Sequence, residues 1–137
     1  EDKVKALNEA KRVVKDNGYI FISYYINDYA IMKHGFIDKN IKSAFEKGNV
    51  NEEFHVVSKE NDLYSFVTME EIDKLKNECK LVREKIISQD GLTDYFRREI
   101  NSLDEEEFKL YLKYHFSICE KYEFLGTSSH VMDILRK

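Results

Sequence analysis

Proline and tryptophan are absent from this chain of 137 residues, and glycine and cysteine are scarce. The five glycines lie too far apart to form a GxGxxG-type loop, so these residues are not expected to cradle a phosphate or a nucleoside. Cys79 and Cys119 lack CxxC spacing and occupy apolar positions near the ends of predicted helices. We therefore expect two buried, reduced thiols.

Metal-ligand patterns and long apolar runs are also missing. No two of the four histidines have the i, i+4 spacing that places two ligands on one helix face, so we predict no metal site. No apolar run approaches the roughly 18 residues that span a bilayer, and no signal-peptide pattern opens the sequence. The net charge of −4 gives no electrostatic reason to expect nucleic acid or a membrane as a partner. We expect one cytoplasmic domain over residues 1–137.

The first 27 residues change from a helical pattern to a strand pattern at Asn17-Gly18. Apolar residues recur every three or four positions from Val4 to Val14, which predicts an amphipathic helix. Asn17-Gly18 can supply the left-handed residue that ends this helix. Tyr19 to Tyr25 is then an almost unbroken run of aromatic and β-branched residues, typical of a strand covered by helices on both faces. The order predicts part of a parallel α/β unit.

The remaining elements have weaker signals. The long helix after residue 104 carries an apolar stripe from Phe108 to Cys119, which we expect to be core, with His115 as a buried core histidine. The other predictions are a helix near 38–47, a hairpin of strands 54–58 and 63–67, a helix after the capping box Thr68 to Glu71, an edge strand at 82–88, a helix near 94–102, a second capping box at 102–105 and a last strand at 130–136.

Several segments resemble the class I S-adenosylmethionine-dependent methyltransferases, most closely those of clostridial type. AKRVVKDNGYIFISYY resembles the helix, glycine turn and fifth strand of that family, although Asp16 and Asn17 stand in place of the usual proline. FVTMEEIDKL, VREKIISQDG and LGTSSHVMDILRK continue the likeness in order. The resemblance implies an α/β fold, namely the C-terminal part of a Rossmann-like domain. Its short mixed sheet would have about three strands, the last one antiparallel between the other two, with a helical lid insertion at 28–67.

The resemblance also implies a methyl-transfer function that this chain does not complete. The family builds its S-adenosylmethionine site mainly from the half of the domain that precedes these segments, so we assign no cofactor-binding residue here. The implied partners are a small-molecule methyl acceptor and the missing N-terminal half of the domain. The isolated chain is expected to be inactive.

Most candidate site residues follow from sheet geometry, because ligands of an open parallel sheet bind beyond the carboxyl ends of its strands. The resemblance further implies that the antiparallel last strand begins at the same edge, which adds Ser129 and His130. His130 is the candidate general base, since imidazole titrates near neutrality. A simpler interpretation of the candidate site residues is that they end strands or make structural hydrogen bonds. The predicted substrate-binding residues are Tyr24, Tyr25, Asn27, Asp28, Gln89, Asp90, Ser129 and His130.

Two other functions stay open from the sequence. One is a non-catalytic interaction module derived from the same fold, whose exposed sheet edge pairs with a partner or forms a homodimer. The other is an independent small enzyme with its base at His130 or Asp90.

Overall fold

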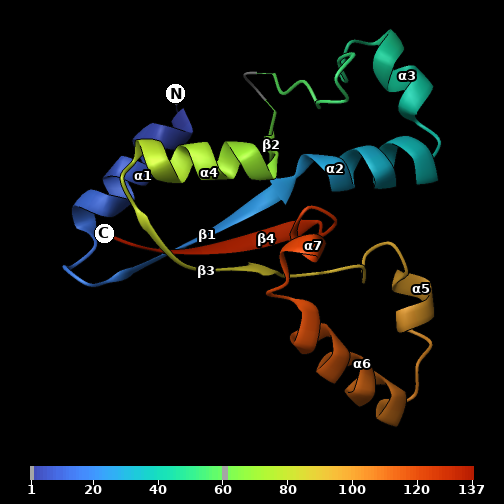
Figure 1. The fold of residues 1–137 in the computed structure, drawn as a ribbon. Helices are drawn as coiled ribbons and strands as arrows, with labels where there is room; N and C mark the ends of the chain where they lie inside the picture. The colour runs from blue at the N-terminus through green and yellow to red at the C-terminus, as the bar shows by residue number, and fades with distance from the viewer. Residues whose placement is uncertain (1, 60–61) are drawn as a thin grey trace.

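An open four-stranded sheet of mixed direction forms the centre of the computed structural model, which describes residues 2–59 and 62–137 (Figure 1). The strand order is β2-β1-β4-β3, and the strands are β1 (Tyr19–Ile26), β2 (Phe66–Val67), β3 (Val82–Ser88) and β4 (His130–Arg136). β2 is parallel to β1, whereas β4 is antiparallel to both β1 and β3. The predicted place of the last strand is confirmed, and the sheet has four strands rather than about three.

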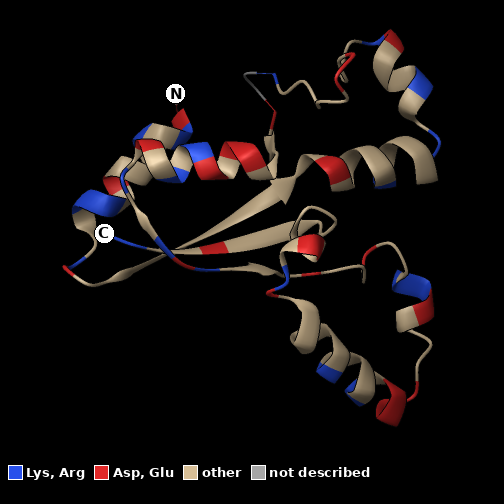
Figure 2. Cartoon of the chain, viewed as in Figure 1, with Lys and Arg blue, Asp and Glu red and all other residues tan. Residues whose placement is uncertain are grey.

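Helices α1 (Asp2–Val13) and α4 (Met69–Glu78) cover one face of the sheet. Leu7, Ile20 and Leu135 pack with Cys79 and Leu81 in the core between them and the strands. Lys, Arg, Asp and Glu alternate along both helices, while β1 carries no charge (Figure 2). Cys79 and Cys119 are free and buried, as predicted.

The local signals around these helices are confirmed. Asn17 has a φ of 63° and is the left-handed residue of the predicted turn. Gly18 is needed for a different reason, because a Cβ there would lie 2.9 Å from the carbonyl oxygen of Lys15. At α4, the Thr68 hydroxyl accepts a hydrogen bond from the amide of Glu71, whose carboxylate accepts one from the amide of Thr68.

A largely helical arm continues from the end of β1, made of α2 (Asn27–Ala30), the π-helix η1 (Ile31–Ile37), α3 (Ile41–Glu46) and the segment that follows α3 up to residue 57 (Figure 1). Helix α3 matches the predicted helix at 38–47, but α2 and η1 were not predicted. The predicted hairpin of 54–58 and 63–67 is wrong, and part of its turn lies outside the described residues. Phe66–Val67 pairs with β1 instead, where Val67 becomes buried. An isolated two-stranded hairpin is marginal, so pairing with a covered strand is favoured.

The segment between β3 and β4 lies on the other side of the sheet and contains α5 (Arg97–Ile100), α6 (Glu105–Ile118) and α7 (Tyr122–Leu125). The second capping box is two residues later than predicted, with Asp104 and Glu107 as its pair. The helix predicted at 94–102 is reduced to α5.

The expectation that the α6 stripe is core is wrong. Phe108 is 42% exposed and Phe116 is 70% exposed, and His115 is only half-buried. Helix α6 extends away from the sheet (Figure 1), so only its end, at Ile118 and Cys119, is buried. Amphipathic periodicity predicts which side of a helix is apolar, but does not supply the partner that covers it.

One ion pair is built into the sheet. Asp133 of β4 is fully buried, and its two carboxylate oxygens accept hydrogen bonds from Nε and Nη2 of Arg83 on β3, each at 2.7 Å. Arg83 also contacts Asp73 of α4. The bond to Asp133 is the main reason why the pKa of Arg83 is raised.

Tyr24 leads to the first prediction, because its buried hydroxyl has no hydrogen-bond partner among the described residues. We expect Tyr24→Phe to raise the free energy of unfolding at pH 7 by up to about 1 kcal/mol, since it removes an unsatisfied polar group. Burial, followed by the charge of Asp133, raises the pKa of Tyr24 to about 12. In the unfolded chain the Tyr24 hydroxyl ionises near pH 10. The folded state therefore loses stability relative to the unfolded state as pH rises from about 10 to 12. Tyr24→Phe should therefore lessen the alkaline loss of stability.

The measurement is urea unfolding at pH 7 and pH 11. Tyr19→Phe, which changes a half-exposed tyrosine on the same strand, is the matched control. A loss of more than about 1 kcal/mol at pH 7 would show that the Tyr24 hydroxyl is hydrogen-bonded in the folded protein.

Candidate functional site

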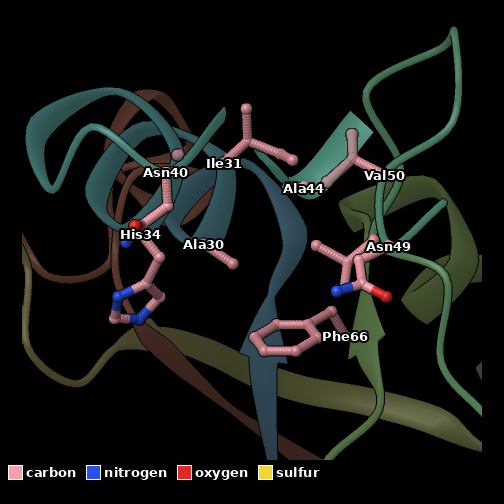
Figure 3. A pocket seen from close by; sticks show the side chains of 10 residues that line it. Ala30, Ile31, His34, Asn40, Ala44, Asn49, Val50 and Phe66 are labelled. Carbon is pink, nitrogen blue, oxygen red and sulfur yellow. The ribbon is translucent and has the colours of Figure 1, made fainter. Parts of the chain in front are cut away.

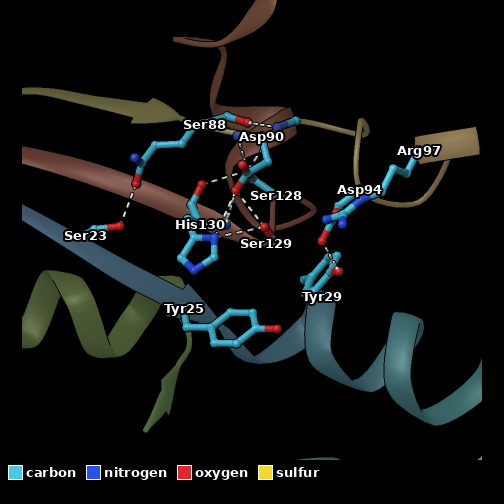
Figure 4. Close-up of polar contacts among 12 residues, drawn as sticks. Ser23, Tyr25, Tyr29, Ser88, Asp90, Asp94, Arg97, Ser128, Ser129 and His130 are labelled. Atoms are coloured by element: carbon cyan, nitrogen blue, oxygen red, sulfur yellow. Dashed lines mark hydrogen bonds and ion pairs between the residues drawn. The ribbon is translucent and has the colours of Figure 1, made fainter. Parts of the chain in front are cut away.

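The carboxyl ends of β1 and β3 meet the beginning of β4 at one rim of the sheet (Figure 4). Tyr25 of β1 lies opposite His130 of β4, and Ser88 at the end of β3 lies opposite Val131. The amide of Gln89 donates to the carbonyl of His130, which places the turn at 89–91 beside the start of β4. The structure thus brings together five of the predicted site residues, namely Tyr25, Gln89, Asp90, Ser129 and His130.

Asp90 organises this rim. Its Oδ2 accepts hydrogen bonds from the Ser129 hydroxyl at 2.6 Å, the His130 amide at 3.0 Å and His130 Nδ1 at 3.0 Å. A carboxylate can only accept, so Nδ1 of His130 carries the proton and Nε2 is the basic nitrogen of the neutral ring. Both side chains are partly exposed. This is the arrangement that a general base requires.

Ser128 fixes the turn that carries Asp90, a role that the sequence analysis missed. Its buried hydroxyl accepts from the amides of Asp90 and Gly91 and donates to the carbonyl of His130. Gly91 has a φ of 55°, and a Cβ there would lie 3.1 Å from Nδ1 of His115. Glycine is therefore favoured at this position of the turn.

Tyr25 lies between two histidine–carboxylate pairs. Its ring stacks on His130 with centroids 4.7 Å apart, and its hydroxyl donates to Nε2 of His34 at 3.1 Å. Nδ1 of His34 in turn donates to Asp38 at 3.2 Å. Burial is the main cause of the raised pKa of Tyr25, so this phenol stays protonated at neutral pH. The sequence analysis also missed His34 and Asp38, although their i, i+4 spacing was a readable signal.

A second contact ties the arm to the turn after β3. The buried Tyr29 donates its hydroxyl to Asp94, which also pairs with Arg97. The bond from Tyr29 is the main cause of the lowered pKa of Asp94, while burial is the main cause of the raised pKa of Tyr29. The Tyr95 ring packs edge-on against Tyr29, with centroids 5.1 Å apart. These rings connect α2 to the loop before α5.

Three predicted site residues do not lie at this rim. Tyr24 is buried on the face of the sheet that packs against α4, because side chains alternate between the faces of a strand. Asn27 is buried and binds the backbone of the arm through Phe54 and Val56. Asp28 is exposed on another side of α2, where it lines a separate pocket.

A small cavity of about 180 Å³ lies inside the arm, between η1, α3 and the segment around Val50 (Figure 3). Its lining is mainly apolar, and His34 and Phe66 form part of its wall. His34 therefore lies between this cavity and the hydroxyl of Tyr25. A movement of the arm would change the surroundings of the cavity and of the Tyr25 hydroxyl.

The outer edge of β1 is largely open. β2 pairs only with Tyr25 and Ile26, and Phe21 is 63% exposed. The amide of Ile26 bonds toward β4, so by alternation the amides of Phe21 and Ser23 face the open edge. A groove of about 580 Å³ follows this edge from α1 to Tyr25 and His130.

Comparisons with known proteins add no assignment, since no family model matches the sequence and no curated protein matches it. Within residues 2–59 and 62–137, no three His, Cys, Asp or Glu side chains cluster in a way that could hold a metal ion. The helices in that part of the chain are too short or too polar to cross a membrane.

Proposed function

We propose that this chain is the acceptor-side half of a class I S-adenosylmethionine-dependent methyltransferase. The observation that carries the proposal is the position of β4, antiparallel between β1 and β3. That order is the one implied by the sequence resemblance, and it joins Tyr25, Asp90 and His130 at one rim.

The residues of this chain do not fit a complete cofactor site. Gly48 and Gly91, the glycines with positive φ in the described part, lie in separate turns, and the described strands are not followed by a glycine-rich loop. We therefore assign the cofactor contacts to segments outside this chain. The outer edge of β1 supports this division, because a strand edge that is uncharged and unpaired except at Tyr25 and Ile26 is suited to receive a neighbouring strand.

The roles of this chain's own residues are binding, orientation and proton acceptance. Nε2 of His130 accepts the proton of an acceptor O–H or N–H group, while Asp90 holds the opposite nitrogen protonated. The Tyr25 hydroxyl, kept in place by His34, orients the acceptor beside that ring. S-adenosylmethionine would supply the methyl group from the other half of the domain. Orientation of donor and acceptor contributes most of the rate in such transfers.

The test compares this chain with a form extended upstream by about 100 residues, the length of a cofactor-binding half-domain. We expect the extended protein, but not residues 1–137, to bind radiolabelled S-adenosylmethionine. Absence of binding by the folded, extended protein would contradict the proposal. Full methyl transfer by residues 1–137 alone would contradict the half-domain assignment and support an independent enzyme.

Tyr25→Phe is expected to lower the methyl-transfer rate of the extended protein about tenfold, which corresponds to one lost hydrogen bond. Tyr19→Phe is the control, since Tyr19 lies at the far end of the same strand. Equal methyl-transfer rates for the two variants would show that the Tyr25 hydroxyl has no role in the reaction. The comparison requires initial rates at saturating S-adenosylmethionine.

The second candidate function is a non-catalytic module that dimerises through β1. The exposed side chain of Phe21 and the open backbone edge favour it. Analytical ultracentrifugation distinguishes the two candidates. A dimer whose formation is prevented by a Ser23→Pro substitution would support the module, whereas a monomer at high concentration would contradict it.

A further inference from the structure

A second, apolar pocket lies apart from the rim, between the arm and the loop before α5. Its volume is about 510 Å³, within the usual range for small-molecule sites. Met32 and Ile37 of η1 form one wall, and Leu92, Tyr95 and Phe96 form another. Gly126 and Thr127 complete the lining together with Asp28.

Among the described residues, Asp28 is the only charged one that lines this pocket. In the described part of the chain its carboxylate joins no ion pair, and its side-chain hydrogen bond is a long contact of 3.4 Å from the Asn27 amide group. Asp90 and Asp94 differ in this respect, because each is held by short contacts to neighbouring side chains. Asp28 thus presents an available negative charge beside an apolar wall.

This combination selects the charge of a ligand. An anion would be repelled by Asp28, and a neutral apolar molecule would remove water from the carboxylate without replacing its hydrogen bonds. A cation would pair with the carboxylate, and the rings of Tyr95 and Phe96 would attract it further through their π faces. We propose that the pocket binds a small apolar amine in its ammonium form, with the nitrogen at Asp28 and the apolar part between η1 and Phe96.

The pocket is linked to the rim by packed rings. Tyr95 contacts Tyr29, and Tyr29 contacts Tyr25 with centroids 5.9 Å apart. An amine held at Asp28 is thus connected to the rim only through these rings, and its binding does not rest on the proposed function.

The test uses 2-phenylethylamine and its neutral isostere 2-phenylethanol, titrated separately into residues 1–137 at pH 7 and followed by NMR shifts of the Tyr95 and Phe96 rings. We expect the amine to bind about tenfold more tightly than the alcohol, the size of one partly exposed charge pair with a cation–π contribution. Asp28→Asn should abolish this preference while leaving alcohol binding unchanged. Asp16→Asn, which removes an exposed carboxylate elsewhere, should leave the preference intact.

Phe96→Ala provides the second variant and should weaken both probes to a similar extent, which locates them in this pocket. Equal affinity of the two probes, an unchanged preference in Asp28→Asn, or no binding of either probe up to about 10 mM would each overturn the inference. Amine binding by a chain whose extended form transfers no methyl group would contradict only the proposed function. Methyl transfer without amine preference would contradict only this inference.

Discussion

Replacing Arg83 with alanine is expected to lower the free energy of unfolding by about 3–5 kcal/mol. Asp133 is fully buried, and both of its carboxylate oxygens are bonded to the Arg83 guanidinium. Removal of the guanidinium leaves a negative charge inside the sheet without a partner and without water. Such a charge costs far more than the net value of the intact pair, which is why a single deletion has a large effect.

Urea unfolding at pH 7 measures this loss. Lys85→Ala on the same strand is the matched control, because Lys85 and Glu120 form an exposed ion pair that should contribute less than about 1 kcal/mol. The double variant Arg83→Met with Asp133→Leu should recover much of the loss, since it removes both charges and keeps apolar volume. A loss of less than 1 kcal/mol for Arg83→Ala would mean that water reaches Asp133.

Asn27→Ala is expected to destabilise the arm by about 2–3 kcal/mol. The buried carboxamide of Asn27 accepts a hydrogen bond from the amide of Val56 at 2.9 Å and donates one to the carbonyl of Phe54 at 3.0 Å. Alanine leaves these backbone groups without their partners, and unsatisfied buried groups carry a full desolvation penalty. The effect should concentrate in the segment from Asn49 to Val57, which Asn27 holds against the end of β1.

Hydrogen exchange with mass spectrometry distinguishes this local effect from global unfolding. We expect faster exchange across 49–57 in Asn27→Ala, with β4 protection little changed. Asn101→Ala, at an exposed asparagine after α5, is the control and should leave the arm's exchange as in the parent. Unchanged exchange in 49–57 would show that other contacts hold the segment.

The elements that could be predicted are those with a dense local signal. Thr68 and Glu71 lie three residues apart, so their capping box depends on one turn of chain. β1 is an eight-residue strand of aromatic and β-branched character, and its helix-to-strand turn at Asn17 requires only neighbouring residues. The antiparallel position of β4 came from the family resemblance rather than from periodicity.

The errors concern contacts between distant segments. Phe66–Val67 has the same strand propensity whether it pairs with residues 54–58 or with β1, and only the three-dimensional fold selects β1. The stripe on α6 is apolar in either environment, so its pattern could not reveal that Phe116 would be exposed. Asn27 was assigned to a ligand because strand ends favour polar residues, yet its partners are Phe54 and Val56.

The sequence by itself determined the local structure of this protein: the helix-to-strand change at Asn17, the strand Tyr19–Ile26, the cap at Thr68 and the polar ends of the strands. These features depend on backbone sterics and on hydrogen bonds between residues a few positions apart. Only the tertiary structure decided that Tyr25 stacks on His130, that His34 supports its hydroxyl and that Asp28 stands in a pocket of its own. The stacked pair Tyr25 and His130 is separated by more than a hundred positions in the sequence, and such contacts form only when the sheet packs and selects its partners by burial.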